Sequence, residues 1–298
     1  MMKSKMNVIA KVLLIVVCYL TIPACASSPK QSSVPVANSS KTESSKMPIN
    51  SDSKSSAVKA SASSTASPAI AQMTQKDGSI HIQYIGNSCF SILFADGTIL
   101  VTDPYGRLLA SSFAPFPELK ANVITTACGF GDHQDGKSEV DGSPKIIQYT
   151  EVNKPIKVGD VEITGYAAKH CANLGDEAIF VYKEGKYKIV NMGEADKIDS
   201  TKLKAAIKDA DVILTYAGEY GEVKNKELFQ TVSKTNVKVM IPEHYSMDPK
   251  FLYYKQPTID TILTELPQGM KVNKASELVL KNDMEKQFLV LSPIGGTK

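Results

Sequence analysis

Residues 125–135 read TTACGFGDHQD and end in an Asp-His pair just after a short apolar run. The run itself, NVITTA (122–127), is typical of a buried strand, so the polar stretch begins where that strand ends. Binding residues are concentrated on loops that a rigid scaffold carries. Asp132 and His133 offer a carboxylate oxygen and an imidazole nitrogen, both of which are zinc ligands in proteins. The stretch therefore predicts a metal or catalytic loop at a strand end.

The segments around this stretch fall into two kinds. The first half alternates apolar and polar residues between short turns such as Asp96-Gly97, which is typical of antiparallel hairpins. The second half alternates apolar strands with stretches of helical spacing. The expected strands and hairpins are 80–85, 89–95, 98–103, 122–127, 154–170, 177–196, 211–216, 237–245, 277–281 and 287–292, and the expected helices are 199–210, 224–235 and 257–266. This order predicts an α+β fold with two sheets covered by helices.

Three of the four histidines follow predicted strands: His133, His170 and His244. The fourth, His81, lies inside a predicted strand and is expected to be an ordinary strand residue. Glu194 follows a hairpin in the same way as the three histidines. Because several such residues stand at strand ends, a metal or catalytic cluster is a better interpretation than four unrelated structural side chains.

The segment YIGNSCFSILFADGTILVTDPYG (84–106) resembles the opening of metallo-β-lactamase-fold proteins, particularly the lactonase-like branch. In that branch a Gly-x-Ser turn, a hairpin and an Asp-Pro-Tyr follow in this order. The family signature His-x-His-x-Asp-His aligns with CGFGDH (128–133), and the later family ligands align with His170, Glu194 and His244. The resemblance covers nearly all of 80–298. It implies the four-layer αβ/βα sandwich of that family, with metal-binding loops along one edge of the two sheets.

The chain departs from the signature at two early ligand positions. Cys128 and Phe130 stand where the family has histidines. A phenyl ring cannot bind a metal, and Cys128 together with His170 falls short of the three protein ligands usual for catalytic zinc. The ligand types of the other ion are kept, at Asp132, His133, Glu194 and His244. The resemblance therefore implies the chemistry of one ion rather than two.

The first functional hypothesis is a hydrolase that depends on one metal ion, with zinc expected and manganese or iron as alternatives. The ion would lower the pKa of a bound water toward about 7. Asp132 and Glu194 are the expected catalytic residues, and Glu194 is either the fourth ligand or the base. Cys128 and His170 would line the altered first site, where they orient substrate or hold a second ion in part. The resemblance implies a lactone, ester, amide or phosphoester as the small-molecule substrate.

The second hypothesis is a catalytically inactive binding or accessory lipoprotein on a degenerate metallohydrolase fold. Loss of two early histidines is expected when selection for two-metal chemistry has ended. Cys128 and Cys171 lie on loops that should converge, so a disulfide outside the cell could close the old site. The partner would then be an envelope ligand instead of a substrate.

The first 25 residues have the order of an export signal. Lysines precede an apolar run at 12–20, and small residues around Cys25 follow it. The run is shorter than the roughly 20 residues that span a bilayer. IPAC (22–25) looks like a bacterial lipobox, which makes Cys25 the expected lipidation site; plain signal cleavage and secretion is the alternative. The chain is therefore expected to be exported, extracytoplasmic and anchored to the cell membrane by lipid.

Residues 26–75 are rich in Ser, Ala, Lys and Pro and contain no aromatic residue and no glycine. Such a segment cannot bury enough apolar surface to offset its ordering entropy, so we expect a disordered tether. The folded domain is expected to be 76–298. The net charge is only +3, and no basic stripe is interleaved with aromatics. Nucleic acid is therefore not an expected partner, and the sequence leaves the oligomeric state open.

Overall fold

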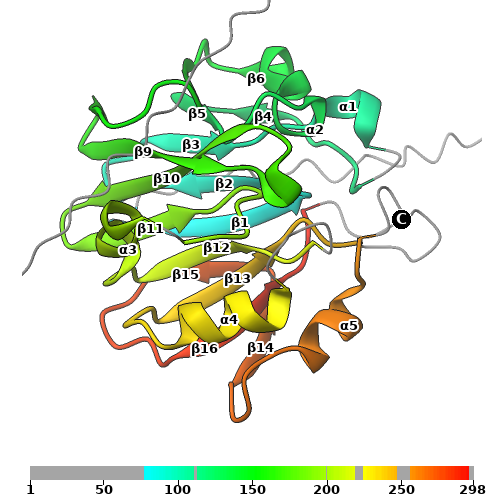
Figure 1. The fold of residues 1–298 in the computed structure, drawn as a ribbon. Coiled ribbons are helices and arrows are strands. Elements are labelled where there is room, and N and C mark those ends of the chain that lie inside the picture. The colour runs from blue at the N-terminus through cyan, green and yellow to red at the C-terminus, as the bar shows by residue number, and fades with distance from the viewer. Residues whose placement is uncertain (1–76, 111–112, 199, 219–223, 247–255, 295–298) are drawn as a thin grey trace, which may run out of the picture. The chain divides into compact units, whose positions relative to one another are not determined.

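A computed structural model describes residues 77–110, 113–198, 200–218, 224–246 and 256–294 (Figure 1). All of them belong to the unit Ser63–Lys298. The expected export signal, the tether and Cys25 lie outside the described residues. No helix in the described ranges combines the length and the apolar character needed to cross a membrane.

Six strands form the first sheet, in the order β15-β1-β2-β3-β5-β7. Their bounds are β1 (His81–Gly86), β2 (Cys89–Leu93), β3 (Ile99–Thr102), β5 (Val123–Thr126), β7 (Lys145–Gln148) and β15 (Glu277–Val279). β1, β2 and β3 pair antiparallel, whereas β3, β5 and β7 pair parallel. Asn87 makes the tight turn between β1 and β2 at φ 52, a conformation that asparagine tolerates better than most residues.

Eight strands form the second sheet, in the order β14-β16-β13-β12-β11-β10-β9-β8. Their bounds are β8 (Pro155–Val158), β9 (Val161–Lys169), β10 (Asp176–Glu184), β11 (Tyr187–Asn191), β12 (Val212–Tyr216), β13 (Val239–Glu243), β14 (Val272–Ala275) and β16 (Gln287–Leu291). β8 to β11 form antiparallel hairpins, and the pairs from β11 onward are parallel. Parallel neighbours need crossover connections. Helices supply them: α3 (Thr201–Ile207), α4 (Asn225–Ser233) and α5 (Ile259–Thr264).

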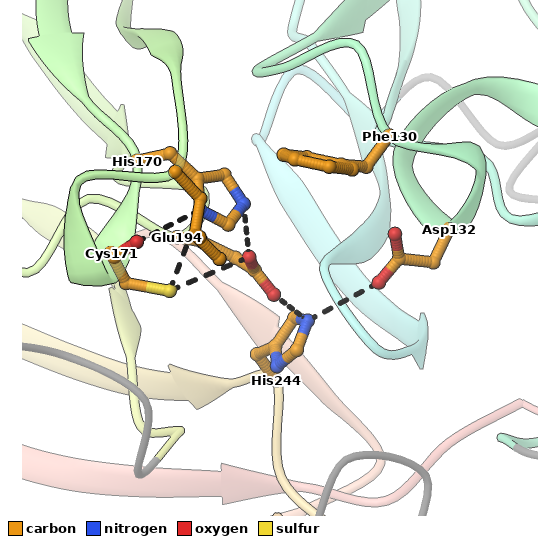
Figure 2. Close-up of a pocket in the computed structure, with 7 residues that line it drawn as sticks. Phe130, Asp132, His170, Cys171, Glu194 and His244 are labelled. Atoms are coloured by element: carbon orange, nitrogen blue, oxygen red, sulfur yellow. Dashed lines mark hydrogen bonds and ion pairs between the residues drawn. The ribbon is translucent and has the colours of Figure 1, made fainter.

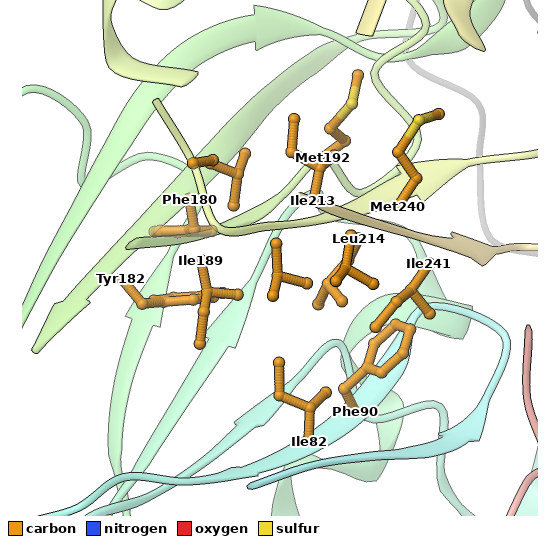
Figure 3. Packing of buried hydrophobic residues seen from close by; sticks show 14 of the residues in the cluster. Ile82, Phe90, Phe180, Tyr182, Ile189, Met192, Ile213, Leu214, Met240 and Ile241 are labelled. Carbon is orange, nitrogen blue, oxygen red and sulfur yellow. The ribbon is translucent and has the colours of Figure 1, made fainter. Parts of the chain in front are cut away.

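The two sheets bury a shared apolar core between their inner faces (Figure 3). Figure 3 shows Phe90 of the first sheet pointing toward Leu214 and Ile241 of the second, while the neighbouring Ile213 and Met240 point to the opposite face. This alternation follows from the two-residue period of a strand. Each fully buried side chain of this size stabilises the fold by about 1.5–3 kcal/mol. The second sheet is therefore apolar on both faces, one against the first sheet and one against its helices.

A thinner layer covers the outer face of the first sheet. It contains α1 (Gly106–Leu109), α2 (Gly131–Gln134), the 3-10 helix η1 (Asp135–Glu139) and the two-stranded sheet of β4 (Leu119–Lys120) and β6 (Val140–Asp141). A second apolar cluster, built around Tyr105 and its edge-on contacts with Phe113 and Phe116, fixes this layer to the sheet. The α+β four-layer sandwich is thus confirmed, with helices of only four or five residues in this layer.

Strand directions bring four loops to one edge of the sandwich. β9 and β11 run in the same direction, because each pairs antiparallel with β10. β13 shares that direction through the parallel pairs of β11, β12 and β13. The end of β5 lies beside the start of β10, where the N–H of Ala178 donates to the carbonyl of Ala127 over 2.8 Å. The segments that follow β5, β9, β11 and β13 therefore meet.

Candidate metal centre

Five predicted site residues come together at this edge, each from a segment that follows a strand. Figure 2 labels Asp132, His170, Glu194 and His244 among them. Asp132 and His133 belong to α2 after β5, His170 follows β9, Glu194 follows β11 and His244 follows β13. All five are buried, with at most 7% of each residue's surface exposed. Buried charged groups need partners, so these side chains can only be stable as a mutually compensating cluster or around a cation.

The first group consists of Asp132, His133, Glu194 and His244, whose ligand atoms all lie within 4.8 Å of one another. Nε2 of His244 is 3.4 Å from Oδ2 of Asp132 and also contacts Oε1 of Glu194. Zinc bonds of 2.0–2.1 Å in a tetrahedron place the ligand atoms about 3.3 Å apart. Two imidazoles and two carboxylates at this spacing fit a divalent ion.

His133 shows the fit most clearly. Its Nδ1 donates to Oδ1 of Asp103 over 3.2 Å, which leaves Nε2 as the free nitrogen of the ring. This Nε2 is buried and makes no hydrogen bond. It lies 3.7 Å from Oε1 of Glu194 and 3.9 Å from Oδ2 of Asp132. A bare nitrogen lone pair facing two carboxylates is unfavourable unless a proton or a cation lies between them.

Asp103 is hydrogen-bonded to His133 and to two neighbouring segments. Besides His133, its Oδ1 accepts from the backbone N–H of Ala127 over 2.6 Å, and its Oδ2 accepts from the amide of Asn191 over 2.8 Å. The residue is fully buried at φ 41, directly after β3. Asp103 therefore fixes both the end of β5 and the ring of His133 from below the site.

The second group consists of His170, Cys171 and Glu194, again with ligand atoms within 4.8 Å of one another. Cys171 was expected only as a disulfide partner, and its membership in this group was missed. Its position next to His170 in the chain was the available signal. Cys128 is buried against His133 and His170 but belongs to neither group. Among the described residues the thiols of Cys89, Cys128 and Cys171 are all free.

Opposite charges within the cluster offset the free-energy cost of burying its ionised side chains. Burial alone would raise the pKa of Glu194, but His244, His133 and His170 outweigh it and hold that pKa well below its usual range. Burial lowers the pKa of His244, whereas Glu194 and Asp132 raise it, to about 9. The carboxylates thus remain charged at neutral pH, as ligands of a cation must be.

Two polar side chains that the sequence did not single out also orient the cluster. The amide of Gln256 lies 2.6 Å from Nδ1 of His244, and with its oxygen toward Nδ1 it would leave Nε2 free for a cation. Asn87 ties the site to the turn after β1: its carbonyl accepts from the N–H of His244 over 2.9 Å, and its amide donates to the carbonyl of Asp132 over 3.1 Å. His244 itself stands at φ 59. Nothing in the sequence pointed to Gln256, whereas the Gly-Asn-Ser turn gave a signal for Asn87.

A pocket of about 170 Å³ opens onto the cluster. Asp132, His170, Cys171, Glu194 and His244 line its floor together with the apolar residues Phe130 and Leu174. Phe130 is 44% exposed, and its ring centre lies 4.7 Å from that of His170. Where the family signature has a ligand, this chain therefore has an apolar wall.

Comparisons with known proteins agree with this architecture. Residues 81–244, from β1 to the last histidine of the cluster, match the family model described as the beta-lactamase superfamily domain. The fold is similar to the crystal structure of a Thermotoga maritima protein that is assigned to the zinc-dependent hydrolases of the metallo-β-lactamase superfamily. That similarity has 24% identity and a TM-score of 0.56, and it covers 71% of this chain and 98% of the other.

A metallohydrolase of the archaeon Ignicoccus hospitalis is also similar, with 12% identity and a TM-score of 0.47 over 69% of this chain and all of the other. No curated protein gives a significant match. The matched residues make up more than half of the chain and contain all five members of the buried cluster. The chain therefore belongs to the beta-lactamase superfamily.

Proposed function

We propose that the chain is a membrane-tethered, metal-dependent hydrolase in which one ion, expected to be zinc, is held by Asp132, His133, Glu194 and His244. The buried, unpartnered Nε2 of His133 carries this proposal, because it faces two carboxylates at 3.7 and 3.9 Å. When bound, the ion would supply Lewis acidity and a water of lowered pKa. The donor set also suits manganese or iron, which bind to imidazole and carboxylate.

The chain's own residues would position the reaction. Asp132 and Glu194 both line the pocket, so their carboxylates are placed to accept the proton that an attacking water loses. Asp103 and Gln256 hold the imidazoles in fixed orientations and keep their Nε2 atoms directed at the carboxylates. Phe130 and Leu174 would exclude bulk water from the mouth once a substrate lies between them.

The pocket favours a small neutral acyl compound. The described residues that line it include apolar side chains and the cluster itself, but no lysine or arginine. Enzymes that act on phosphoesters usually clamp the extra negative charge with such cations or with additional metal ions. We therefore rank lactones and esters first, amides next and phosphoesters last, in line with the resemblance to the lactonase-like branch.

The tether and the lipid anchor complete the proposal. They rest on the order of the N-terminal sequence, with its basic start, its apolar run and the IPAC stretch that ends at Cys25. A domain held in this way would act on molecules near the outer face of the membrane.

Metal content and hydrolysis measured together test the function. The protein is purified without chelator or immobilised nickel, its metals are counted by mass spectrometry, and it is screened against lactones and esters. We expect about one zinc, manganese or iron ion in the first group, where Asp132, His133 and His244 supply the three protein ligands usual for catalytic zinc and Glu194 is the fourth ligand or the base. His133→Ala and His244→Ala should each lose that ion and the activity, whereas His81→Ala, in β1 outside both groups, should keep both.

Two results would contradict the proposal. Activity that survives His133→Ala or His244→Ala would place the chemistry elsewhere. A reduced protein that takes up no metal, even with zinc added, would favour the binding or accessory lipoprotein, since the cluster would then be stable through its internal ion pairs alone.

A further inference from the structure

We infer that the chain has a second cation site, formed by His170, Cys171 and Glu194, which binds thiophilic divalent ions such as zinc, cadmium or cobalt through the thiolate of Cys171. The inference extends the proposed function, because Glu194 would be shared with the ion of the first group. It differs from the ligand set expected from the sequence, in which Cys128 was the sulfur beside His170.

Glu194 is placed to serve both groups. Its Oε1 faces His244 and His133, and its Oε2 faces His170 and Cys171. Figure 2 shows the carboxylate between His244 on one side and His170 and Cys171 on the other. The carboxylate therefore has one oxygen on each side, as a bridging ligand requires.

The ring of His170 is oriented for binding through Nε2. Its Nδ1 lies 3.2 Å from the carbonyl oxygen of Cys171, which can only accept, so Nδ1 carries the proton. Nε2 is buried, lacks a hydrogen bond and lies against Oε2 of Glu194. Two lone pairs that face each other at such close range require a cation or a proton between them.

Cys171 adds a third donor beside Glu194. Its sulfur is 3.7 Å from Oε2 of Glu194 and 3.5 Å from Nδ1 of His170, and the ligand atoms of the three residues lie within 4.8 Å of one another. The hydroxyl of Tyr216 donates to this sulfur over 3.5 Å and holds it in this position. Cys171 is only 2% exposed, yet it lines the pocket, so an ion can reach it from that side.

The ligand count suits an ion with an open position. Three protein ligands are the usual number for zinc that keeps a fourth place for water or substrate. Here the fourth place would face the pocket, beside the ring of Phe130, which packs on His170 and supplies no donor. Phe130 thus leaves open the coordination position that a histidine would occupy.

Sulfur makes the two groups selective for different ions. The first group offers only nitrogen and oxygen, which manganese accepts, whereas thiolate favours softer ions such as zinc and cadmium. Saturation with manganese should therefore fill only the first group, and saturation with cadmium should fill both.

The experiment compares cadmium with manganese on the full chain, kept reduced by a reagent that does not bind metals. Equilibrium dialysis should give about two cadmium ions but about one manganese ion per chain, as the ligand preferences require. Bound cadmium should show the ultraviolet charge-transfer absorption of a thiolate complex. Cys171→Ser, which keeps the size of the side chain, should bind about one cadmium ion and lose this absorption.

Manganese binding is the control for folding, because a Cys171→Ser protein that still binds one manganese ion is folded. Cys89→Ala, which alters a buried thiol in the outer cluster, should match the wild type. One cadmium ion without thiolate absorption would refute the second site and leave the proposed function standing. Loss of cadmium in Cys128→Ala rather than in Cys171→Ser would also overturn it, and absence of both metals would refute the proposed function itself.

Discussion

At the scale of single residues, the site depends on side chains that never touch a substrate. His133 can offer Nε2 to an ion only because Asp103 holds the proton on Nδ1. Asp103 in turn is fixed by Ala127 and Asn191, so the ring orientation is connected to two strand ends.

Asp103→Asn should weaken metal binding about 10- to 100-fold, as loss of an outer partner of a histidine ligand commonly does. The new amide group replaces one carboxylate oxygen and opposes a donor of Ala127, Asn191 or His133. Isothermal titration with zinc measures the affinity. Asp211→Asn is the matched control, since Asp211 accepts a backbone hydrogen bond from Lys188 at the start of β11, whereas Glu194 follows the end of that strand. Equal affinities in the two variants would show that Asp103 does not orient His133.

The sequence correctly indicated which residues would meet where each of them follows a strand, and it failed where a contact between distant segments brought a residue to the site. His133, His170, His244 and Glu194 each follow a strand, and the sequence shows this. Gln256 reaches His244 from a different segment, and that contact exists only after folding. The sequence indicated Cys128 as the sulfur near His170, and Cys128 does lie against that ring. It did not indicate Cys171, which the structure groups with His170 and Glu194.

At the scale of elements, a polar contact joins the two sheets below the site. The hydroxyl of Tyr182 in β10 lies 2.7 Å from Oγ1 of Thr125 in β5, and both side chains are buried. β5 carries the segment of Asp132 and His133, so this contact connects the first sheet's part of the cluster to the second sheet.

Tyr182→Phe should lower the free energy of unfolding by about 1–3 kcal/mol, because Thr125 would keep a buried hydroxyl without a partner. Urea unfolding followed by circular dichroism gives the value. The control is Tyr187→Phe, whose hydroxyl bonds to Asn282 at an exposed site and should cost less than about 0.5 kcal/mol. If the two variants lose equal stability, the hydrogen bond between Tyr182 and Thr125 contributes no more to stability than an exposed hydrogen bond does.

The sequence predicted helices and strands best where the hydrophobic pattern is long and its apolar residues are buried. The hairpins of β8 to β11 and the alternation of strands and helices from α3 to β13 agree with the expected ranges to within a few residues. β7 and β14 were missed because both are four-residue edge strands with largely exposed side chains, and they lack a strong apolar alternation. β14 and β15 are neighbours in sequence but join different sheets. Tertiary packing alone decides which sheet each strand joins.

At the scale of the whole molecule, the two sheets contribute loops to one site, so a bound ion would link them. Binding of an ion to the folded state alone stabilises it by about 2.7 kcal/mol at a free concentration of 100 times Kd. The α+β sandwich could be predicted from the resemblance and the element order together, whereas the thin outer layer over the first sheet could not, because its short helices leave no periodic signal.

Removal of metal by a chelator should therefore lower the melting temperature by about 5–10 °C for a domain of this size. Differential scanning calorimetry with and without added manganese, which only the first group is expected to bind, measures the shift. His133→Ala serves as the control and should melt at the same temperature in both conditions. A shift of equal size in this variant would mean that manganese stabilises the protein through some other site.

The proposed anchor gives a second prediction at this scale. Cys25→Ser removes the expected lipidation site and should move the protein from the membrane fraction to the soluble exported fraction. Cell fractionation and immunoblotting follow the change, with Cys18→Ser, inside the expected signal, as the control that stays at the membrane. A Cys25→Ser protein that remains in the membrane fraction would contradict lipid anchoring at this residue.

Anomalous diffraction at the zinc absorption edge, from crystals grown with zinc, tests the metal centre most directly. The account predicts a peak bonded to Nε2 of His133 and His244 and to the carboxylates of Asp132 and Glu194. Crystals soaked with zinc that show no peak among these four side chains, while the histidines keep the positions described above, would contradict it.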